Sequence, residues 1–484
     1  MSGSLWLTPP APGATGTLPA IPRPRPSWAA PDPVDELAHR LEDLIAAAVH
    51  PDEIAAILES DGMTDDHIRL TYGRPDSFAL AEDLYARVER RFPEPDGPPT
   101  DPWHTGLGGC LLRGLVFALP GLAYVLGAPF LAGPPGALGL PAGTVPLLAG
   151  AVTGWVWNQA LSHRAYSWLG LGDRQAAART LLTGTPAGAL AGAVVAVAAT
   201  GSGEWGAAAF AAGQALYLAA ATVLLVLDRE KALLGALLPL AAGAPVAFWY
   251  DPPLAVRTAL LLASLVAAVA LALRVLVPLA APGVPGRAAP RLAASLPYGL
   301  FGLGTGGLVL YAALGDVLAD GPGAVVAAPS AVALTLSMGP AEWLLHRFRS
   351  ESLAGLRAST SARAFRRTTA TTLALCLTAY LTVLSALALA GTLLWPGAPE
   401  LGGLRLVSLL LIGSVLWAAL LLQSFGAALS AALVCVAATG AQTVSLATGT
   451  GDPRAAGAVI AGTAAAVMAA LGWVLLGRAT THRA

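Results

Sequence analysis

Charged residues are scarce in this chain of 484 residues, and lysine is almost absent from it. Asp, Glu, Lys and Arg make up only 12% of the residues, whereas soluble domains carry about a quarter. Lys231 is the single lysine, the formal net charge is −1, and no basic cluster occurs. The sequence therefore gives no indication of nucleic-acid binding. The strong preference for Arg, together with abundant Ala, Gly and Pro, is typical of a GC-rich bacterial genome.

Cysteine is rare and isolated. Cys110, Cys376 and Cys435 lie apart within apolar stretches, without a CxxC pair or a neighbouring histidine. Such cysteines pack as small apolar side chains far more often than they hold a metal or a redox centre, so no cofactor and no metal site is expected. The N-terminus also lacks the basic and then apolar pattern of a cleaved signal peptide.

Enzyme motifs are missing as well. The chain has no HExxH motif and no supported GxSxG motif. Membrane glycosyltransferases pair carboxylates at an outer loop, and only Asp316 and Asp320 come near such a pair. The stretch FGLGTGG at 301–307 lies inside an apolar run, where glycine serves close helix packing rather than phosphate binding. We therefore expect a protein that is not an enzyme.

Long apolar runs are what the chain has in abundance. Hydrophobic residues make up 55% of it, and its mean hydropathy is +0.65. A run of about 20 apolar residues crosses a bilayer as a helix. The sequence therefore predicts an all-α, polytopic membrane protein that lies in the lipid bilayer. Its twelve predicted spans lie near 110–132, 139–162, 179–200, 205–227, 232–249, 255–279, 295–315, 324–346, 368–394, 403–423, 425–446 and 455–477.

The first hundred residues are more polar than the rest. Apolar residues recur at steps of three and four from Val34 to Val88, which predicts a small acidic bundle of short helices that begins at Asp32-Pro33. Pro-rich stretches on either side of it predict a disordered tail and a linker. The predicted segments are the tail at 1–32, the helical bundle at 33–93, the linker at 94–106, a first six-span lobe at 107–284, and a second six-span lobe with a short tail at 285–484.

Arginine is unevenly distributed between the two sets of loops. The connections after the second, fourth, sixth and eighth spans, together with the C-terminal tail, carry about fifteen Arg and Lys residues. The alternate connections offer only Arg257, Arg405 and Arg454. Cytoplasmic loops carry the excess of positive charge. The sequence thus predicts a multi-pass protein of the bacterial plasma membrane whose two termini and helical bundle at 33–93 are cytoplasmic.

Two polar stretches interrupt the apolar pattern at equivalent places. WNQALSHRAYSWLGLGDRQAA at 157–177 ends the second span, and AEWLLHRFRSESLAGLRAS at 341–359 ends the eighth. Aligning their His-Arg pairs places Gln159 opposite Glu342. Transporters built from two parallel six-span repeats show this kind of correspondence. The alternative is that any cytoplasmic helix end attracts Arg and His.

The repeat interpretation predicts that each half holds a cytoplasmic gate. If the ends of the second and eighth spans approach each other, Glu342 would face Arg164 or Arg174 and hold the closed form. The predicted gate residues are His163, Arg164, Asp173, Arg174, Glu342, His346 and Arg347.

The loop at 162–180, SHRAYSWLGLGDRQAAART, resembles one that multidrug/oligosaccharidyl-lipid/polysaccharide exporters carry after their second helix. Arg164 is followed by a Gly-x-Gly-Asp stretch that ends at Asp173 and then by a helix start rich in Ala and Arg. Pro120 is also similar in place to the bend in that family's first helix. The resemblance covers span number and loop position over 107–478. It implies two six-helix lobes, a V-shaped cavity between them, alternating access, and a substrate class that includes lipid-linked oligosaccharides.

Two features depart from that family. Its ion-coupled multidrug members commonly carry a carboxylate in their first helices, and the first span here has none. Its lipid-linked-sugar flippases commonly line their cavity with several arginines, for which only Arg113 and Arg274 are candidates here. The substrate class therefore stays open.

Polar residues within the predicted spans are the other functional candidates, because polar groups are costly in a membrane and face the interior of a helix bundle. For the uncharged ones, a hydrogen bond between helices is the more frequent role. The candidates for lining a substrate cavity are Asn158, Gln159, Gln214, Tyr217, Arg274, Tyr380 and Gln423.

Three functions are compatible with these patterns. The favoured one is a transporter or flippase that moves a lipid-linked or amphiphilic substrate, such as a cell-envelope polysaccharide precursor, by alternating access. The second is a membrane-anchored scaffold whose bundle at 33–93 recruits a cytoplasmic protein partner. The third, a membrane enzyme that acts on a lipid carrier, is the least supported.

Overall fold

The chain folds into two compact units, residues 1–100 and residues 101–484. The computed structural model describes residues 32–91, 106–134, 140–201, 204–280, 290–320, 328–395, 402–449 and 451–482. These residues form helices and contain no strand. The tail predicted at 1–32 and the linker predicted at 94–106 lie outside the described residues, apart from their last residues.

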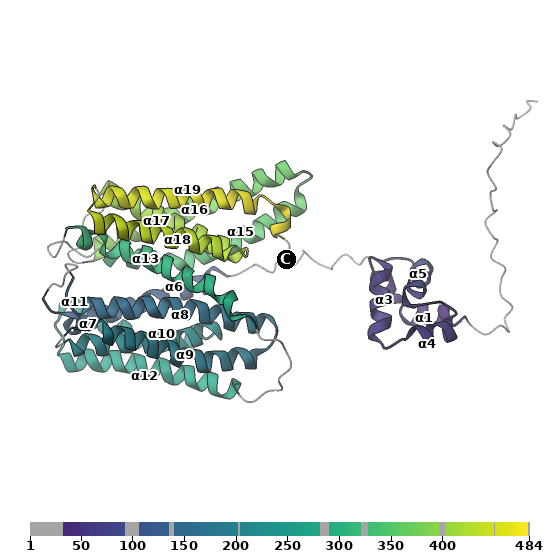
Figure 1. Ribbon diagram of the computed structural model, residues 1–484, viewed down its shortest axis with the longest axis horizontal. Helices are drawn as coiled ribbons and strands as arrows, with labels where there is room; N and C mark the ends of the chain where they lie inside the picture. Colours follow the sequence, from purple (N-terminus) through teal and green to yellow (C-terminus); the bar gives the residue numbers. More distant parts are fainter. Residues whose placement is uncertain are drawn as a thin grey trace, which may run out of the picture. The chain divides into compact units, whose positions relative to one another are not determined.

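Five short helices make up the described part of the first unit (Figure 1). Polar side chains cap several of them: Asp32 accepts a hydrogen bond from the backbone nitrogen of Val34 at 3.1 Å, and Thr64 and Asp76 cap later helices in the same way. Gly73, with a φ of +66°, ends the fourth helix in the left-handed conformation that glycine tolerates. The helices are α1 (Pro33–Arg40), α2 (Glu42–Ala47), α3 (Pro51–Ser60), α4 (Asp65–Tyr72) and α5 (Ser77–Arg87).

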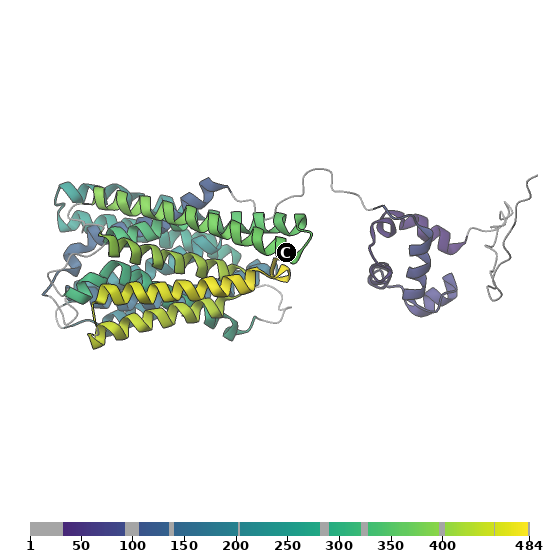
Figure 2. The ribbon, with the colours of Figure 1, turned by 90° about the horizontal axis from the view of Figure 1, so that it is seen from above.

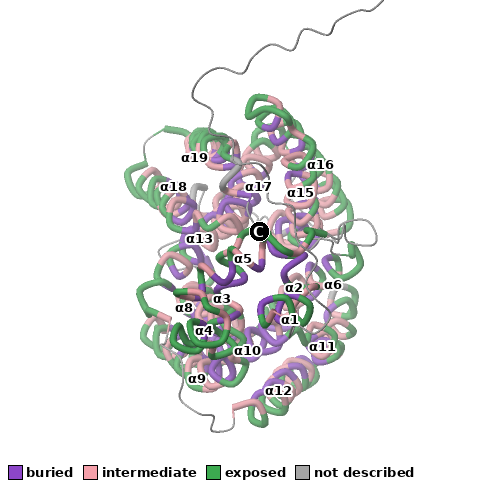
Figure 3. The backbone as a smooth tube through the Cα atoms, turned by 90° about the vertical axis from the view of Figure 1, so that its right-hand side faces the viewer, coloured by how far each residue is buried: buried purple, intermediate pink, exposed green. Residues whose placement is uncertain are grey.

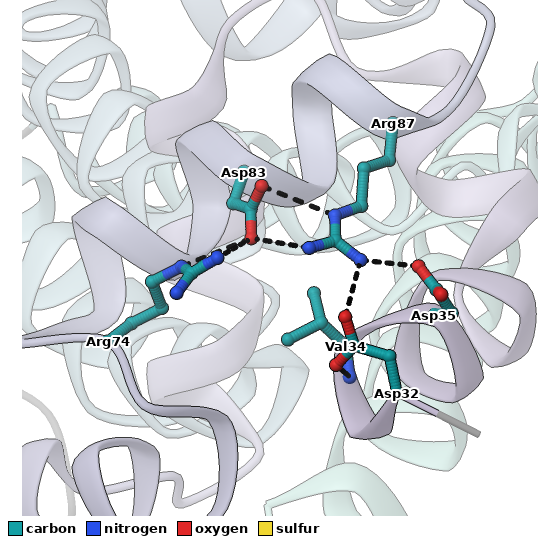
Figure 4. Close-up of polar contacts among 6 residues, drawn as sticks. All are labelled: Asp32, Val34, Asp35, Arg74, Asp83 and Arg87. Atoms are coloured by element: carbon teal, nitrogen blue, oxygen red, sulfur yellow. Dashed lines mark hydrogen bonds and ion pairs between the residues drawn. The ribbon is translucent and has the colours of Figure 1, made fainter. Parts of the chain in front are cut away.

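A network of charges joins the first and last helices of this unit (Figure 4). The helices of the unit share one apolar core. Asp83 on α5 accepts hydrogen bonds from Arg74, at 2.6 Å, and from Arg87. Arg87 also donates to Asp32, at 3.1 Å, and to Asp35 at the start of α1. Desolvation alone would raise the pKa of Asp83, but the hydrogen bonds from Arg74 and Arg87 outweigh it and lower that pKa.

The lowered pKa of Asp83 predicts that acid weakens this unit. The ionised carboxylate stabilises the folded unit above the unfolded pKa of about 4, and this contribution is lost as the pH falls through the lower folded value. We expect Asp83→Asn to weaken protection of the α5 amides at pH 6 and to reduce the further loss between pH 6 and pH 3. Hydrogen exchange of the intact chain, corrected for intrinsic rates, measures both effects. Asp66→Asn, at an exposed residue paired with Arg69, is the matched control. An unchanged acid response in Asp83→Asn would contradict the assignment.

The second unit consists of long helices and short 3₁₀ turns (Figures 1 and 2). In its first half these are α6 (Leu107–Ala118), η1 (Leu119–Leu122), α7 (Ala123–Leu131), α8 (Thr144–Gly170), α9 (Arg174–Ala198), α10 (Trp205–Val226), α11 (Glu230–Trp249) and α12 (Leu254–Leu279). In its second half they are η2 (Leu292–Ser295), α13 (Leu296–Asp320), α14 (Ala328–Leu336), α15 (Met338–Ala358), α16 (Ala362–Leu394), α17 (Gly403–Ser424), α18 (Ala428–Thr448), α19 (Pro453–Leu476) and η3 (Ala479–His482).

Ten helical segments of the described chain are long and apolar enough to cross a membrane, and each coincides with a predicted span. They include α6–η1–α7 taken as one segment, in which the predicted bend at Pro120 is a 3₁₀ turn. They also include α17 and α18, which the short predicted break near Gly426 separates. The chain is therefore a multi-pass membrane protein.

The two remaining predicted spans, near 139–162 and 324–346, correspond to α8 and to α14–α15, which do not meet that standard of length and hydropathy. In α8, polar residues such as Asn158 and Gln159 lower the hydropathy of a helix that is long enough. The other span is interrupted at Ser337, because Pro340 has no amide hydrogen to bond the carbonyl of Leu336. These two helices contain most of the two polar stretches, at 157–177 and 341–359, that occupy equivalent places in the two halves of the sequence.

The long helices form two bundles that lie side by side (Figures 1 and 2). One large cluster of buried apolar side chains comes from α6–α12 and another from α13–α19. The helices of each half can be numbered from one to six in chain order, with α6–η1–α7 counted as the first helix of the first half and α14–α15 as the second helix of the second half. With this numbering, matching pairs of helices pack together in both bundles. The first helix packs on the fifth, the second on the third, the third on the fourth, and both the fourth and fifth on the sixth. In the first bundle the second also packs closely on the fourth. In the second bundle these two helices are joined by Trp417 of α17, whose Nε1 donates to the carbonyl oxygen of Ala341 on α15 at 3.3 Å.

Exposed residues lie on the outside of these bundles and buried residues inside (Figure 3). Many of the exposed residues are large and apolar. Leu190 on α9, Val266 on α12 and Leu375 on α16 each expose more than half of their surface. A soluble protein rarely exposes so much continuous apolar surface, whereas a lipid environment favours it.

Two crossings join the bundles, α8 on α13 and α6 on α15. Glycine allows close approach at both. A Cβ on Gly339 of α15 would lie 2.6 Å from the carbonyl oxygen of Cys110, and a Cβ on Gly302 of α13 would lie 2.8 Å from that of Trp155. The crossings are equivalent: in each, the second helix of one half meets the first helix of the other.

Candidate functional site

An ion-pair network joins the two bundles at the crossing of α6 and α15. Arg113 on α6 donates to Glu230 at the start of α11, from Nε at 2.8 Å and from Nη2 at 2.5 Å. Its Nη1 donates to Glu342 on α15. The arginine is about one-third exposed, and both carboxylates are more buried. Because Glu230 belongs to the first bundle and Glu342 to the second, this single guanidinium links carboxylates of both.

His346 extends the network by one turn of α15. Its Nε2 lies 3.9 Å from Glu342 Oε1, and its Nδ1 is buried without a hydrogen-bond partner among the described residues. The i and i+4 spacing expected for Glu342 and His346 therefore brings them onto one face.

The matching stretch on α8 contacts the start of the other half. His163 Nδ1 lies 3.0 Å from Ser295 Oγ, and its ring stacks on Tyr298 of α13 with 3.8 Å between ring centroids. Arg164 Nη1 donates to the carbonyl oxygen of Pro290 at 2.9 Å. Farther along the same crossing, Gln159 packs against Gly302.

Glu342 does not pair with Arg164 or Arg174 in this structure. Glu342 pairs with Arg113, Arg164 bonds the backbone before α13, and Arg174 is exposed in the first turn of α9. Among the described residues, α8 and α15 share no extensive contact. The two stretches therefore do not meet each other; each meets the first helix of the opposite half.

Two other gate candidates have local roles. Asp173 caps α9 by accepting a hydrogen bond from the backbone nitrogen of Ala176 at 2.8 Å. Arg347 pairs with Glu351 one turn later, at 2.7 Å, and lies over the ring of Trp343. Neither bridges the bundles in the described structure.

The seven cavity candidates lie on α8, α10, α12, α16 and α17. Gln214 on α10 donates to Tyr124 Oη at 2.6 Å, and Tyr380 on α16 lies 3.2 Å from Ser337 Oγ. Tyr217 packs on the apolar core of the first bundle, and Arg274 is exposed on α12. Side-chain oxygens without a hydrogen-bond partner among the described residues remain buried on three of the candidates: Asn158, Gln214 and Gln423.

Glu230 was not predicted, and Arg113 was proposed only as a cavity arginine. Glu230 lies between Arg229 and Lys231 in a basic loop. In the sequence it is indistinguishable from an ordinary solvent-exposed carboxylate of such a loop. It is 117 residues from Arg113, and Glu342 is 229 residues from Arg113. Only Glu342 is marked in advance, because no other carboxylate lies inside a predicted span.

The described residues contain no group of three His, Cys, Asp or Glu side chains that could hold a metal ion. The contacts observed at the two crossings are ion pairs and hydrogen bonds between helices. No protein-family model matches the chain, and no curated protein matches it.

Proposed function

We propose that this protein is a membrane transporter whose two helix bundles rock against each other to move an amphiphilic or lipid-linked substrate. The observation that carries the proposal is the Arg113 network, in which one cation bonds a carboxylate from each bundle. Ionisable groups within membrane helices are costly and concentrate where function needs them. An ion pair that joins two moving parts is a contact that one state can make and another can break.

The matched packing of the two bundles supports the same proposal. Two halves with equivalent helix pairs and equivalent crossings are typical of transporters built from parallel repeats around a central site. On this proposal α8 and α14–α15 are the two further spans, for twelve in all. The arginine-rich ends of α8 and α15 face the cytoplasm of a bacterial cell, as do both termini. The resemblance to polysaccharide and lipid-linked oligosaccharide exporters suggests a cell-envelope precursor as the substrate.

Distances between the bundles test the proposal without knowledge of the substrate. Spin labels are placed on a cysteine-free chain at Gln175 and Arg363, in the first turns of α9 and α16, and in a second variant at Leu254 and Leu393, at the opposite ends of the bundles. Alternating access predicts two distance populations for each pair in lipid nanodiscs. Conditions that lengthen one pair should shorten the other. A single unchanging population for both pairs would contradict the proposal and favour the membrane scaffold instead.

A further inference from the structure

A short segment that follows α19, residues 477–482, packs onto the second bundle and is called the return segment below. It consists of Gly477 and Arg478 and the 3₁₀ turn η3, and that turn contacts α15 as well as α19 (Figure 1). Thr481 Oγ1 donates to the carbonyl oxygen of Leu475 at 2.8 Å, and the Thr481 backbone nitrogen donates to that of Arg478 at 3.1 Å. These hydrogen bonds keep the return segment close to the end of α19.

His482 ends the return segment with its ring buried among aromatic side chains. The residue is only 7% exposed. Its ring centroid lies 6.5 Å from that of Phe348 on α15, 5.2 Å from that of Phe365 on α16, and 5.1 Å from that of Phe425, which follows α17. One imidazole ring therefore joins the second half of α15 to α16 and to the turn between α17 and α18.

The hydrogen bond of His482 shows which form of the ring fits this position. Its Nε2 lies 2.8 Å from the carbonyl oxygen of Leu476. A carbonyl oxygen only accepts hydrogen bonds, so Nε2 carries the hydrogen and Nδ1 is the nitrogen that would take up a proton. Among the described residues no hydrogen bond reaches Nδ1. The neutral ring is thus satisfied here, whereas a protonated ring would bring a second donor without an acceptor.

The charged groups that face His482 from the neighbouring elements are cations. The guanidinium of Arg349 on α15 lies 5.1 Å from the centroid of one of the phenylalanine rings. On α16, Arg366 Cγ lies 3.6 Å from the position that a Cβ on Gly477 would take, and Arg478 belongs to the return segment itself. The turn at 425–427 has no charged residue. None of these groups could pair with a protonated histidine.

The described helices around His482 offer it no carboxylate. Helices α16, α17, α18 and α19 contain no Asp or Glu, and on this part of α15 Glu351 pairs with Arg347 at 2.7 Å. Burial lowers the pKa of His482 from its ordinary value of 6.5, the hydrogen bond to Leu476 raises it, and Arg349 lowers it further. The net shift is downward, so this position favours the neutral ring.

We propose that the return segment is a pH-sensitive latch, which neutral His482 holds closed against α15, α16 and the α17–α18 turn and which protonation of His482 opens. The closed latch would bury the added charge, whereas the opened latch exposes it to water. The latch lies wholly within the second bundle. It therefore goes beyond the proposed transport function and would serve equally in a protein whose bundles stay fixed.

The position of α15 is what the latch controls. The first half of this helix carries Gly339 and Glu342, which contact α6 of the first bundle. Its second half carries Phe348 and contacts the return segment. Opening the latch frees the second half of α15 from the return segment while the crossing with α6 remains.

The direction of the pH effect follows from the lowered pKa of His482. Above about pH 6.5 the histidine is neutral in both the closed and the open latch, so the closed form has its full stability. Below that pH the histidine of the open latch takes up a proton first, and the closed form loses up to about tenfold in its equilibrium per pH unit. Acid therefore opens the latch.

Hydrogen exchange of the full chain in dodecyl maltoside tests the latch. The amides of residues 478–482 and of the last turns of α15 are compared at pH 7.5 and pH 5.5, with correction for intrinsic rates. We expect about three- to tenfold weaker protection at the lower pH. The first turn of α9, which belongs to the other bundle, should change little and is the internal control.

Substitutions assign the response to His482. His482→Gln keeps a donor for the carbonyl oxygen of Leu476 and His482→Phe keeps an aromatic ring, but neither side chain can take up a proton. Each should remove most of the pH difference at residues 478–482, and if one variant misfolds the other carries the test. His50→Gln, at an exposed histidine of the first unit, is the matched control and should respond like the unmodified chain. Equal protection of the unmodified chain at both pH values, or a pH response that persists in a folded His482 variant, would overturn the proposal.

Discussion

Replacing Arg113 by glutamine should destabilise the protein more than any other single charge removal in its membrane unit. The change leaves Glu230 and Glu342 close together without the cation that both bind. Removing one partner of a fully buried ion pair costs about 3–5 kcal/mol. Arg113 is partly exposed, so we expect about 2 kcal/mol, measured as a lower midpoint of thermal unfolding in detergent. Arg357→Gln, at an exposed arginine on α15, should cost less than about 0.5 kcal/mol.

Substituting the two carboxylates of the network one at a time distinguishes its contribution to stability from its contribution to movement between the bundles. Glu342→Gln removes the link between the bundles but leaves Arg113 paired with Glu230 within the first bundle. Glu230→Gln does the opposite. If the link holds the bundles together, Glu342→Gln should shift the spin-label distances toward the separated population, whereas Glu230→Gln should leave them nearly unchanged. Equal effects of the two variants would show that the network stabilises the fold without controlling its movement.

A triple variant in which Arg113, Glu230 and Glu342 are all glutamine completes this test. Since it leaves no uncompensated charge, it should recover most of the stability that Arg113→Gln loses. It should still show the separated distances, because the link is gone. A triple variant as unstable as Arg113→Gln would mean that packing, rather than charge, explains the loss.

Sequence periodicity predicted the helices well, because the hydrophobic pattern of each span is local. The caps at Asp32, Thr64 and Asp76 and the turns at Gly73 and Gly426 are likewise determined by adjacent residues. The break at Ser337 was missed although Pro340 is visible in the sequence. A proline within a span also fits a continuous helix, as Pro186 does in α9, so Pro340 alone did not predict the break.

The candidate site was predicted only in part, for a physical reason. The pairing of the stretches at 157–177 and 341–359 identified two equivalent helices, but it did not identify their partners. His163 meets Ser295 and Tyr298, whereas Glu342 meets Arg113, because the helices on which they pack start with different residues. Such contacts join positions more than a hundred residues apart, so no local pattern predicts them.

A methyl group added at either crossing should force the bundles apart. A Cβ on Gly339 would lie 2.6 Å from the carbonyl oxygen of Cys110, and a Cβ on Gly302 would lie 2.8 Å from that of Trp155. Both obstacles are backbone atoms, so the clash is relieved only if a helix moves. We expect Gly339→Ala and Gly302→Ala each to lower stability by about 1–3 kcal/mol, the usual cost of overpacking. Thermal unfolding in detergent measures this change.

The matched control for both substitutions is Gly440→Ala on α18, because a Cβ there meets nothing within 4 Å. Alanine favours a helix over glycine by about 1 kcal/mol, so this control should be neutral or stabilising. The crossing variants should also enrich the separated distance population at the Gln175 and Arg363 labels, because both crossings join the bundles. If Gly339→Ala and Gly302→Ala unfold at the same temperature as Gly440→Ala, the crossings adjust without moving the helices. In that case close glycine contact does not hold the two halves together, and the ion pairs of Arg113 are the main connection.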